Sequence, residues 1–184
     1  MIKKILIALL ALVVVLAAAV GINNARKGSR QMQVEPLAPV AVDEAAVAAR
    51  LAEAVRLKTI SSRDDANLNA DQFKAFHALL QTRFPKTHAA LKREVVGDLS
   101  LLYTWEGADP QAKPILLMAH QDVVPVAPGT EGDWAVAPFA GEVKDGFVWG
   151  RGSWDDKGNL LSQLDAVEMP VASGYKPPRT IYLA

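Results

Sequence analysis

Three titratable side chains lie at positions in the sequence where a catalytic or metal-binding site could form. His120 and Asp122 follow the apolar run Pro114–Ala119, and Asp155 lies in the glycine-bounded segment GRGSWDDKG. Residues two apart on an extended chain project to the same side, so His120 and Asp122 can act together. A metal-binding imidazole usually donates its second ring nitrogen to a carboxylate or carbonyl, which fixes its tautomer. We therefore expect His120 to bind a metal and Asp122 to orient it.

A His-x-Asp pair alone also fits a strand-end histidine that only hydrogen-bonds to a nearby carboxylate. The second motif, residues 150–158, adds information because glycines surround the adjacent Asp155 and Asp156. Such glycines predict a tight turn that brings backbone close to another group. Adjacent carboxylates repel unless a cation or a helix N-terminus stabilises them. We expect Asp156 to cap the following helix and Asp155 to face the site.

The elements that must position these side chains alternate between helix and strand. Apolar residues recur at helical spacing in Asp43–Lys58, where Asp43 can act as the N-cap, in Asp71–Arg83, which Pro85 ends, and around Leu160–Val167. The third of these helices would begin just after Asp155. It would therefore hold the glycine-rich turn in place.

Four stretches read as strands or hairpins. Val95–Trp105 is rich in residues that favour strands, and Pro114–Ala119 is a short apolar run typical of a strand buried in a sheet. Glu142–Trp149 predicts a hairpin around the turn Lys144-Asp145-Gly146, and Thr180–Ala184 predicts a final strand. Helices and strands in alternation indicate the α/β class, in which ligands bind at strand ends.

The N-terminal segment has the character of a membrane helix. Ile5–Ile22 is entirely apolar or glycine, and 18 residues of helix span roughly 27 Å, close to the ~30 Å hydrocarbon core of a bilayer. We interpret residues 1–24 as an anchor or signal segment, 25–41 as a linker and 42–184 as the globular part. The small residues Ala17 and Ala19 keep signal cleavage open. We expect an extracytoplasmic globular part, periplasmic or lumenal, which would be secreted after cleavage.

Composition limits the other classes of function. The first thirty residues carry five basic side chains and no acid, so the rest has 15 basic against 20 acidic residues. A mildly acidic surface gives no electrostatic footprint for nucleic acid. The chain has no cysteine, so any metal must be held by histidines and carboxylates.

The run from Pro114 to Glu168 resembles a known family. Its segments AHQDVVPV, DWAVAPF and VWGRGSWDDKG, followed by a helix, are similar to the zinc-dependent exopeptidases related to carboxypeptidase S, aminoacylase and the N-acyl amino acid hydrolases. Weaker similarity covers nearly all of residues 43–184, and an N-terminal anchor resembles the carboxypeptidase S branch. The resemblance implies the N-terminal part of a catalytic domain with a mixed sheet flanked by helices.

The resemblance also implies roles for single residues. His120 would bind one of two zinc ions, Asp122 would orient His120 as a catalytic residue, and Asp155 would bridge both ions across a cis peptide bond to Asp156. Paired zinc ions polarise a scissile carbonyl and activate water. We therefore expect hydrolysis of peptide or N-acyl amino acid amide bonds.

In the family, the strand corresponding to Thr180–Ala184 leads into a Glu-Glu pair and then to further ligands, a lid or dimerisation domain, and a distal histidine. We expect the present chain to be an incomplete, inactive part that binds zinc weakly, with a homodimer only in the complete protein. His77 falls in an amphipathic helix and His88 beside it, where surface or packing roles are expected. They do not replace the distal ligands.

Two other functions stay open. The chain could be a non-catalytic, membrane-anchored binding protein that keeps the fold, and the residues encoded after Ala184 would separate this from an enzyme. A two-carboxylate glycosidase that uses Asp122 and Asp155 is a poorer fit, because few aromatic residues could serve as sugar platforms. Some bulky side chains could line the site or pack in the core. They are Trp134, Pro138, Phe139 and Trp154.

Overall fold

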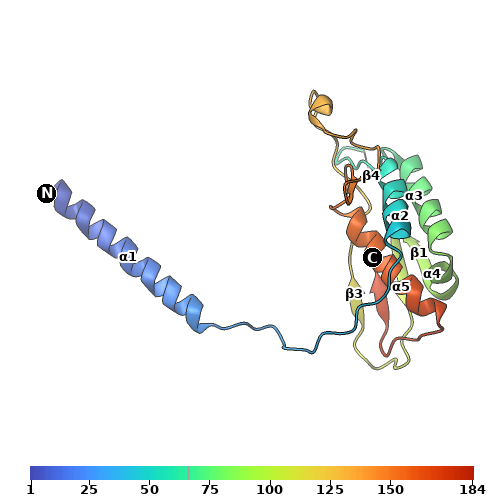
Figure 1. Cartoon of the computed structure of the whole chain (residues 1–184), viewed down its shortest axis with the longest axis horizontal. Helices are drawn as coiled ribbons and strands as arrows, with labels where there is room; N and C mark the ends of the chain where they lie inside the picture. Colours follow the sequence, from blue (N-terminus) through green and yellow to red (C-terminus); the bar gives the residue numbers. More distant parts are fainter. Residues whose placement is uncertain (66) are drawn as a thin grey trace. The chain divides into compact units, whose positions relative to one another are not determined.

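The computed structural model describes residues 1–65 and 67–184 and divides them into two units, Met1–Ala41 and Val42–Ala184. The first unit contains one long helix, α1 (Ile2–Arg26), drawn in blue in Figure 1, and an irregular segment, residues 28–41. Every residue of α1 is exposed within the chain. The helix is long and apolar enough to cross a membrane, properties that a signal sequence shares.

The second unit is built on a mixed sheet of four strands in the order β1-β2-β6-β3. They are β1 (Lys92–Val96), β2 (Ser100–Trp105), β6 (Ile181–Leu183) and β3 (Ile115–Leu117). β1, β2 and β6 pair antiparallel, whereas β3 and β6 run parallel. The carboxyl ends of β3 and β6 therefore lie next to each other at the same end of the sheet.

Four helices accompany this sheet: α2 (Glu44–Arg56), α3 (Ala70–Arg83), α4 (Pro85–Ala90) and α5 (Lys157–Ala172). α2 contacts both α3 and α5, and Figure 1 shows the three helices side by side. The side chain of Asp43 accepts a hydrogen bond from the backbone N–H of Ala46, so the expected N-cap of α2 is confirmed. The α/β class and the three predicted helices are confirmed as well.

The core joins the helices to the sheet. Burying each large apolar side chain contributes about 1.5–3 kcal/mol, so the shared core holds α3 and α5 against β2 and β6. Its largest buried members are Phe76, Leu80, Phe84, Leu91, Tyr103, Trp105, Leu161, Leu164, Val167 and Leu183.

The prediction of a single strand over Val95–Trp105 is wrong. This region lies in a hairpin of β1 and β2, joined by Gly97–Leu99, with a positive φ at Gly97 and Asp98. Glycine and aspartate tolerate the positive φ of such a turn. The turn was missed because apolar residues that favour strands continue on both sides of it. α4 was also missed. Pro85 begins a new helix there, because proline is favoured at the first helical position.

The burial expected for Pro114–Ala119 is also wrong. β3 forms within this run, but Ile115 and Leu116 are 42% and 55% exposed. In the described part of the chain, β3 pairs with β6 alone and lies at the edge of the sheet. An apolar run predicts a strand, whereas burial depends on neighbours that the run itself does not specify.

The hairpin predicted over Glu142–Trp149 is confirmed. β4 (Glu142–Lys144) and β5 (Phe147–Trp149) pair antiparallel around Asp145 and Gly146, which both have positive φ. This backbone conformation is the one that a tight hairpin turn requires. The chain then leads from β5 directly into the glycine-rich turn before α5.

Candidate metal centre

The segment that carries His120 continues from the carboxyl end of β3. Ala119 donates its backbone N–H to Ala184 O over 3.0 Å, which extends the pairing of β3 with β6. Val123 donates to Thr59 O over 2.8 Å, and Ser61 donates to Val123 O over 3.2 Å. The backbone from 119 to 123 is therefore held on both sides at the end of the sheet, where ligand sites of α/β folds lie.

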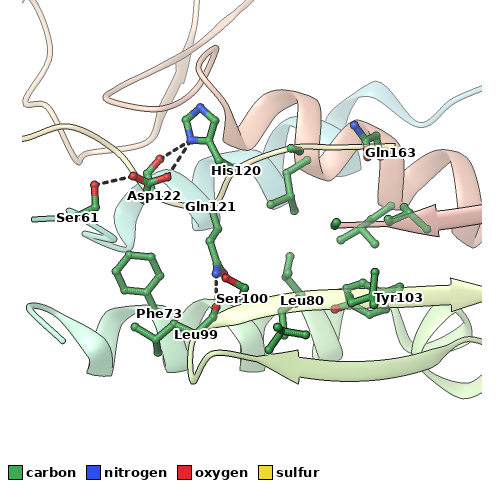
Figure 2. A pocket seen from close by; sticks show the side chains of 18 of the residues that line it. Ser61, Phe73, Leu80, Leu99, Ser100, Tyr103, His120, Gln121, Asp122 and Gln163 are labelled. Atoms are coloured by element: carbon green, nitrogen blue, oxygen red, sulfur yellow. Dashed lines mark hydrogen bonds and ion pairs between the residues drawn. The ribbon is translucent and has the colours of Figure 1, made fainter. Parts of the chain in front are cut away.

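Side chains alternate along this extended segment. Nδ1 of His120 lies 3.0 Å from Oδ1 of Asp122, so the expected pair forms (Figure 2). The side chain of Gln121, between them, instead accepts a hydrogen bond from Nε2 of His77 over 2.9 Å and donates to the carbonyl of Leu99. His120 and Asp122 thus share one environment, and Gln121 fastens the segment to α3 and the β1–β2 hairpin.

The glycine-rich turn lies against the same segment. A Cβ at Gly152, where φ is +85°, would lie 2.5 Å from Cγ1 of Val123, so only glycine allows this approach. A Cβ at Gly158 would lie 2.4 Å from the carbonyl oxygen of Ser153. The close approach of backbone predicted from the glycines is confirmed. The Asp155–Asp156 peptide bond is cis, as the family resemblance implies.

His120 and Asp155, 35 residues apart in the sequence, meet in this turn. Nε2 of His120 lies 2.8 Å from Oδ1 of Asp155, and the two side chains are 53% and 80% exposed. One ring nitrogen therefore faces Asp122 and the other faces Asp155. The three residues selected from the sequence come together in space, and solvent reaches them.

The cap predicted for Asp156 is not formed by its side chain. Asp156 occupies the N-cap position of α5, but its Oδ2 accepts from the backbone N–H of His120 over 3.1 Å and from Nδ2 of Asn159 over 3.2 Å. The carboxylate of Asp156 therefore accepts from the segment after β3 and not from the backbone N–H groups in the first turn of α5. Asp156 consequently ties the glycine-rich turn to His120.

The electrostatics of the site favour positive charge. Partial burial opposes the imidazolium, but the hydrogen bond to Asp155 and the negative charges of Asp122 and Asp156 outweigh it and raise the pKa of His120. Three carboxylates around one exposed imidazole form a small region of negative potential. Such a region attracts a cation.

The donors present fit zinc in kind. Imidazole nitrogen and carboxylate oxygen are common zinc ligands, and Nε2 of His120 lies 2.8 Å from Oδ1 of Asp155. Among residues 1–65 and 67–184, no three His, Asp or Glu side chains converge as a metal site requires. His120 and Asp155 are therefore donors of a suitable kind but fewer than a zinc site usually has.

Lys157 is a feature that sequence reasoning missed. Its side chain is fully buried, and Nζ donates to Ala54 O over 2.9 Å and to Leu57 O over 2.6 Å. Burial lowers the pKa of Lys157 to about 8. The ammonium group fastens the start of α5, and with it the Asp155 turn, to the end of α2. A lysine beside two aspartates gave no sequence signal of burial.

A cavity of about 660 Å³ borders His120 and Asp122 (Figure 2). None of the aromatic or proline residues proposed from the sequence is among the described residues that line it. Trp134 stacks on Arg151, Phe139 faces Lys58, and Trp154 is 91% exposed. The lining is mainly apolar and includes Phe73, Leu80, Leu101, Tyr103, Leu160, Leu164 and Leu183.

His77 and His88 have the packing roles expected for them. His77 is 7% exposed and hydrogen-bonds to Gln121. Nδ1 of His88 donates to Phe84 O over 2.8 Å, and its Nε2 accepts from the hydroxyl of Tyr103 over 3.0 Å. These contacts use Nε2 of His77 and both ring nitrogens of His88.

Comparisons with known proteins place part of the chain in a family context. Residues 116–184 match peptidase family M20/M25/M40. Carboxypeptidase S of Saccharomyces cerevisiae is 44% identical over 142 residues, which cover 73% of this chain and 25% of the relative. An N-fatty-acyl-amino acid synthase/hydrolase of Danio rerio is 41% identical over 133 residues, which cover 71% and 25%.

The fold also has solved counterparts. The crystal structure of an M20 family metallo-carboxypeptidase from Sulfolobus solfataricus matches with a TM-score of 0.55 and 19% identity, over 77% of this chain and 30% of that one. The present chain spans between a quarter and a third of the length of these curated relatives and of this structure. Residues 116–184 thus carry the sequence match to peptidase family M20/M25/M40, and the solved structure shares the fold of this part of the chain.

Proposed function

We propose that residues 42–184 are the N-terminal part of a zinc-dependent hydrolase that cleaves peptide or N-acyl amino acid amide bonds. The observation that carries this proposal is the meeting of His120 and Asp155 at 2.8 Å, with Asp122 hydrogen-bonded to the other side of the imidazole. The similar proteins, named as a carboxypeptidase and an N-fatty-acyl-amino acid synthase/hydrolase, suggest these two substrate classes.

Each residue would have a separate task. Nε2 of His120 would bind one of two zinc ions, and the carboxylate of Asp155 would bridge them. Asp122 would hold the proton on Nδ1, so that Nε2 presents its lone pair. When bound, the zinc ions supply Lewis acidity that polarises the amide carbonyl and makes water a stronger nucleophile.

Residues 1–184 by themselves would hold zinc weakly. His120 and Asp155 provide two donors, whereas a zinc site usually has three or four protein ligands. We expect weak binding and no measurable hydrolysis by this polypeptide. Zinc titration by calorimetry, followed by assays with N-acyl amino acids and short peptides, tests both points. Robust zinc-dependent turnover by the 184-residue chain would contradict the proposed inactivity.

The complete hydrolase is tested in a longer protein in which paired glutamates and a distal histidine follow Ala184. We expect that protein to cleave the same substrates and to lose activity on treatment with a chelator. Substituting His120 or Asp155 by alanine should abolish turnover without unfolding the protein. Full activity in either variant would exclude the proposed roles.

A second candidate is a non-catalytic, membrane-anchored binding protein that keeps the fold. It is favoured by the finding that no three metal-binding side chains converge in the described part of the chain. The coding sequence after Ala184 discriminates between the two. A continuation with paired glutamates supports the enzyme, and a stop codon supports the binding protein.

We also propose that α1 anchors the protein in a membrane, with residues 25–41 as a linker and the globular part on the extracytoplasmic side. The apolar stretch Ile5–Ile22 is long enough to span the hydrocarbon core. Extraction of membranes with alkaline carbonate tests this, since an anchored protein stays in the pellet. N-terminal sequencing distinguishes the anchor from a signal that is cleaved to give a secreted protein.

A further inference from the structure

Ser61 lies beside the candidate metal centre without touching His120. Its hydroxyl donates to Oδ2 of Asp122 over 2.6 Å, while Oδ1 of the same carboxylate accepts from Nδ1 of His120 over 3.0 Å. Figure 2 shows these three side chains as one connected row. Each carboxylate oxygen of Asp122 therefore has one side-chain donor in the described residues, and Ser61 is one of the two.

The position of Ser61 is fixed by its backbone. Ile60 forms a parallel bridge with Val123, and the backbone N–H of Ser61 donates to Val123 O over 3.2 Å. On the opposite side, Gln121 is held by His77 and Leu99. With its backbone held, the hydroxyl of Ser61 can move only between discrete χ1 rotamers, whereas the terminal torsion of an aspartate is broad. Ser61 can therefore set the orientation of Asp122.

The orientation of Asp122 affects which ring nitrogen of His120 carries the proton. Nδ1 faces the carboxylate of Asp122 and, at 3.1 Å, its backbone carbonyl, whereas Nε2 faces the carboxylate of Asp155. A neutral imidazole has a single proton, so the acceptors on its two sides compete for it. Only the tautomer with the proton on Nδ1 leaves the lone pair of Nε2 free for a metal.

We propose that Ser61 is a positioning residue: by orienting Asp122, it keeps the proton of neutral His120 on Nδ1 and leaves Nε2 available to bind a metal. This inference rests on the proposed function, because the tautomer matters only if His120 is a ligand. Ser61 lies 61 positions before Asp122, outside both motifs recognised in the sequence.

The test is the tautomer ratio of His120, measured by nitrogen-15 NMR of the full metal-free chain in detergent micelles at about pH 9, where the imidazole is neutral. We expect the Nδ1–H form to predominate. In Ser61→Ala the ratio of Nδ1–H to Nε2–H should fall about three- to tenfold, as the loss of one hydrogen bond predicts. Ser61→Thr keeps a hydroxyl at an exposed position and should restore the ratio.

Ser62→Ala is the matched control, because the hydroxyl of Ser62 accepts from the backbone of Asp64 and does not reach Asp122. It should leave the ratio unchanged. An unchanged ratio in Ser61→Ala, or a fall in Ser61→Thr equal to that in Ser61→Ala, would overturn the proposal. Zinc titration of the same samples tests the metal site separately. If the chain binds no zinc but Ser61→Ala still shifts the tautomer ratio, the proposed function is contradicted and the role of Ser61 is not.

Discussion

The three histidines of this chain have two kinds of surroundings. His77 and His88 lie against the core, where burial lowers the pKa of each ring, and Gln121, Phe84 and Tyr103 bind their ring nitrogens. His120 is half exposed at the end of a strand, and neighbouring carboxylates raise its pKa. The same side chain is kept neutral in one region and favoured as a cation in the other.

This difference separates groups that stabilise the fold from groups that remain available to a ligand. A buried polar group must be satisfied by the protein itself, so its hydrogen bonds are already used. Asp122 and Asp155 are accessible, and both contact the single imidazole of His120, which leaves a net negative charge at the site. If this interpretation is right, substitutions in the two regions should change different measured quantities.

The largest effect is expected in the buried region, at Lys157. Lys157→Ala removes the ammonium group that satisfies two carbonyls and leaves a cavity beneath the Asp155 turn. We expect the free energy of unfolding to fall by about 3 kcal/mol, measured by urea denaturation. Lys176→Ala, at an exposed position, is the control and should change it by less than about 0.5 kcal/mol. A similarly small change at Lys157 would be evidence against its structural role.

His88 is partly buried against the core and can be compared with His120. His88→Ala should lower the free energy of unfolding by about 2 kcal/mol, because the Tyr103 hydroxyl and the Phe84 carbonyl lose their partner. Zinc binding should not change, which isothermal calorimetry measures. Weaker zinc binding in this variant would mean that the two regions are not separate.

His120→Ala should show the opposite pattern. We expect its dissociation constant for zinc to rise at least tenfold, while urea denaturation shows a change below about 0.5 kcal/mol, since the side chain is half exposed. Asp155→Asn should weaken zinc binding in the same direction. Unchanged zinc affinity in both variants would remove the candidate site from consideration.

The smallest effect is a dependence of stability on pH. The lowered pKa values of His77 and His88 mean that the unfolded chain binds more protons than the folded chain below the ordinary pKa of 6.5. Stability should therefore fall as the pH drops from about 7 towards the lowered values. The raised pKa of His120 acts in the opposite direction, but exposure weakens its contribution. Urea midpoints between pH 7.5 and 5.5 measure the sum, and His88→Gln should give a shallower slope.

Sequence reasoning succeeded where the signal is local. The helix before Lys58, the turn at Asp145 and the pairing of His120 with Asp122 each depend on residues that are close in the chain. The failures depend on distant partners. Nothing near Lys157 predicts that carbonyls about 100 residues earlier accept from it, and nothing near Ser61 predicts its contact with Asp122.

The contact between His120 and Asp155 was only partly predictable from local sequence. No spacing rule connects residues 35 positions apart; the glycine-rich turn suggested that Asp155 faces the site, and the resemblance to a known family implied that it shares a metal site with His120. The glycines at 152 and 158 were the local part of the signal, because they predicted a turn that approaches another group. Which group it approaches is decided by the pairing of β3 with β6 and by the packing of α5.

The central claim is that His120 and Asp155 share a metal ion. Anomalous diffraction at the zinc edge, from crystals of the chain soaked in millimolar zinc, tests it directly. We predict a peak within about 2.0–2.2 Å of both Nε2 of His120 and a carboxylate oxygen of Asp155. Zinc bound only elsewhere, or no peak at this position under saturating zinc, would contradict the account.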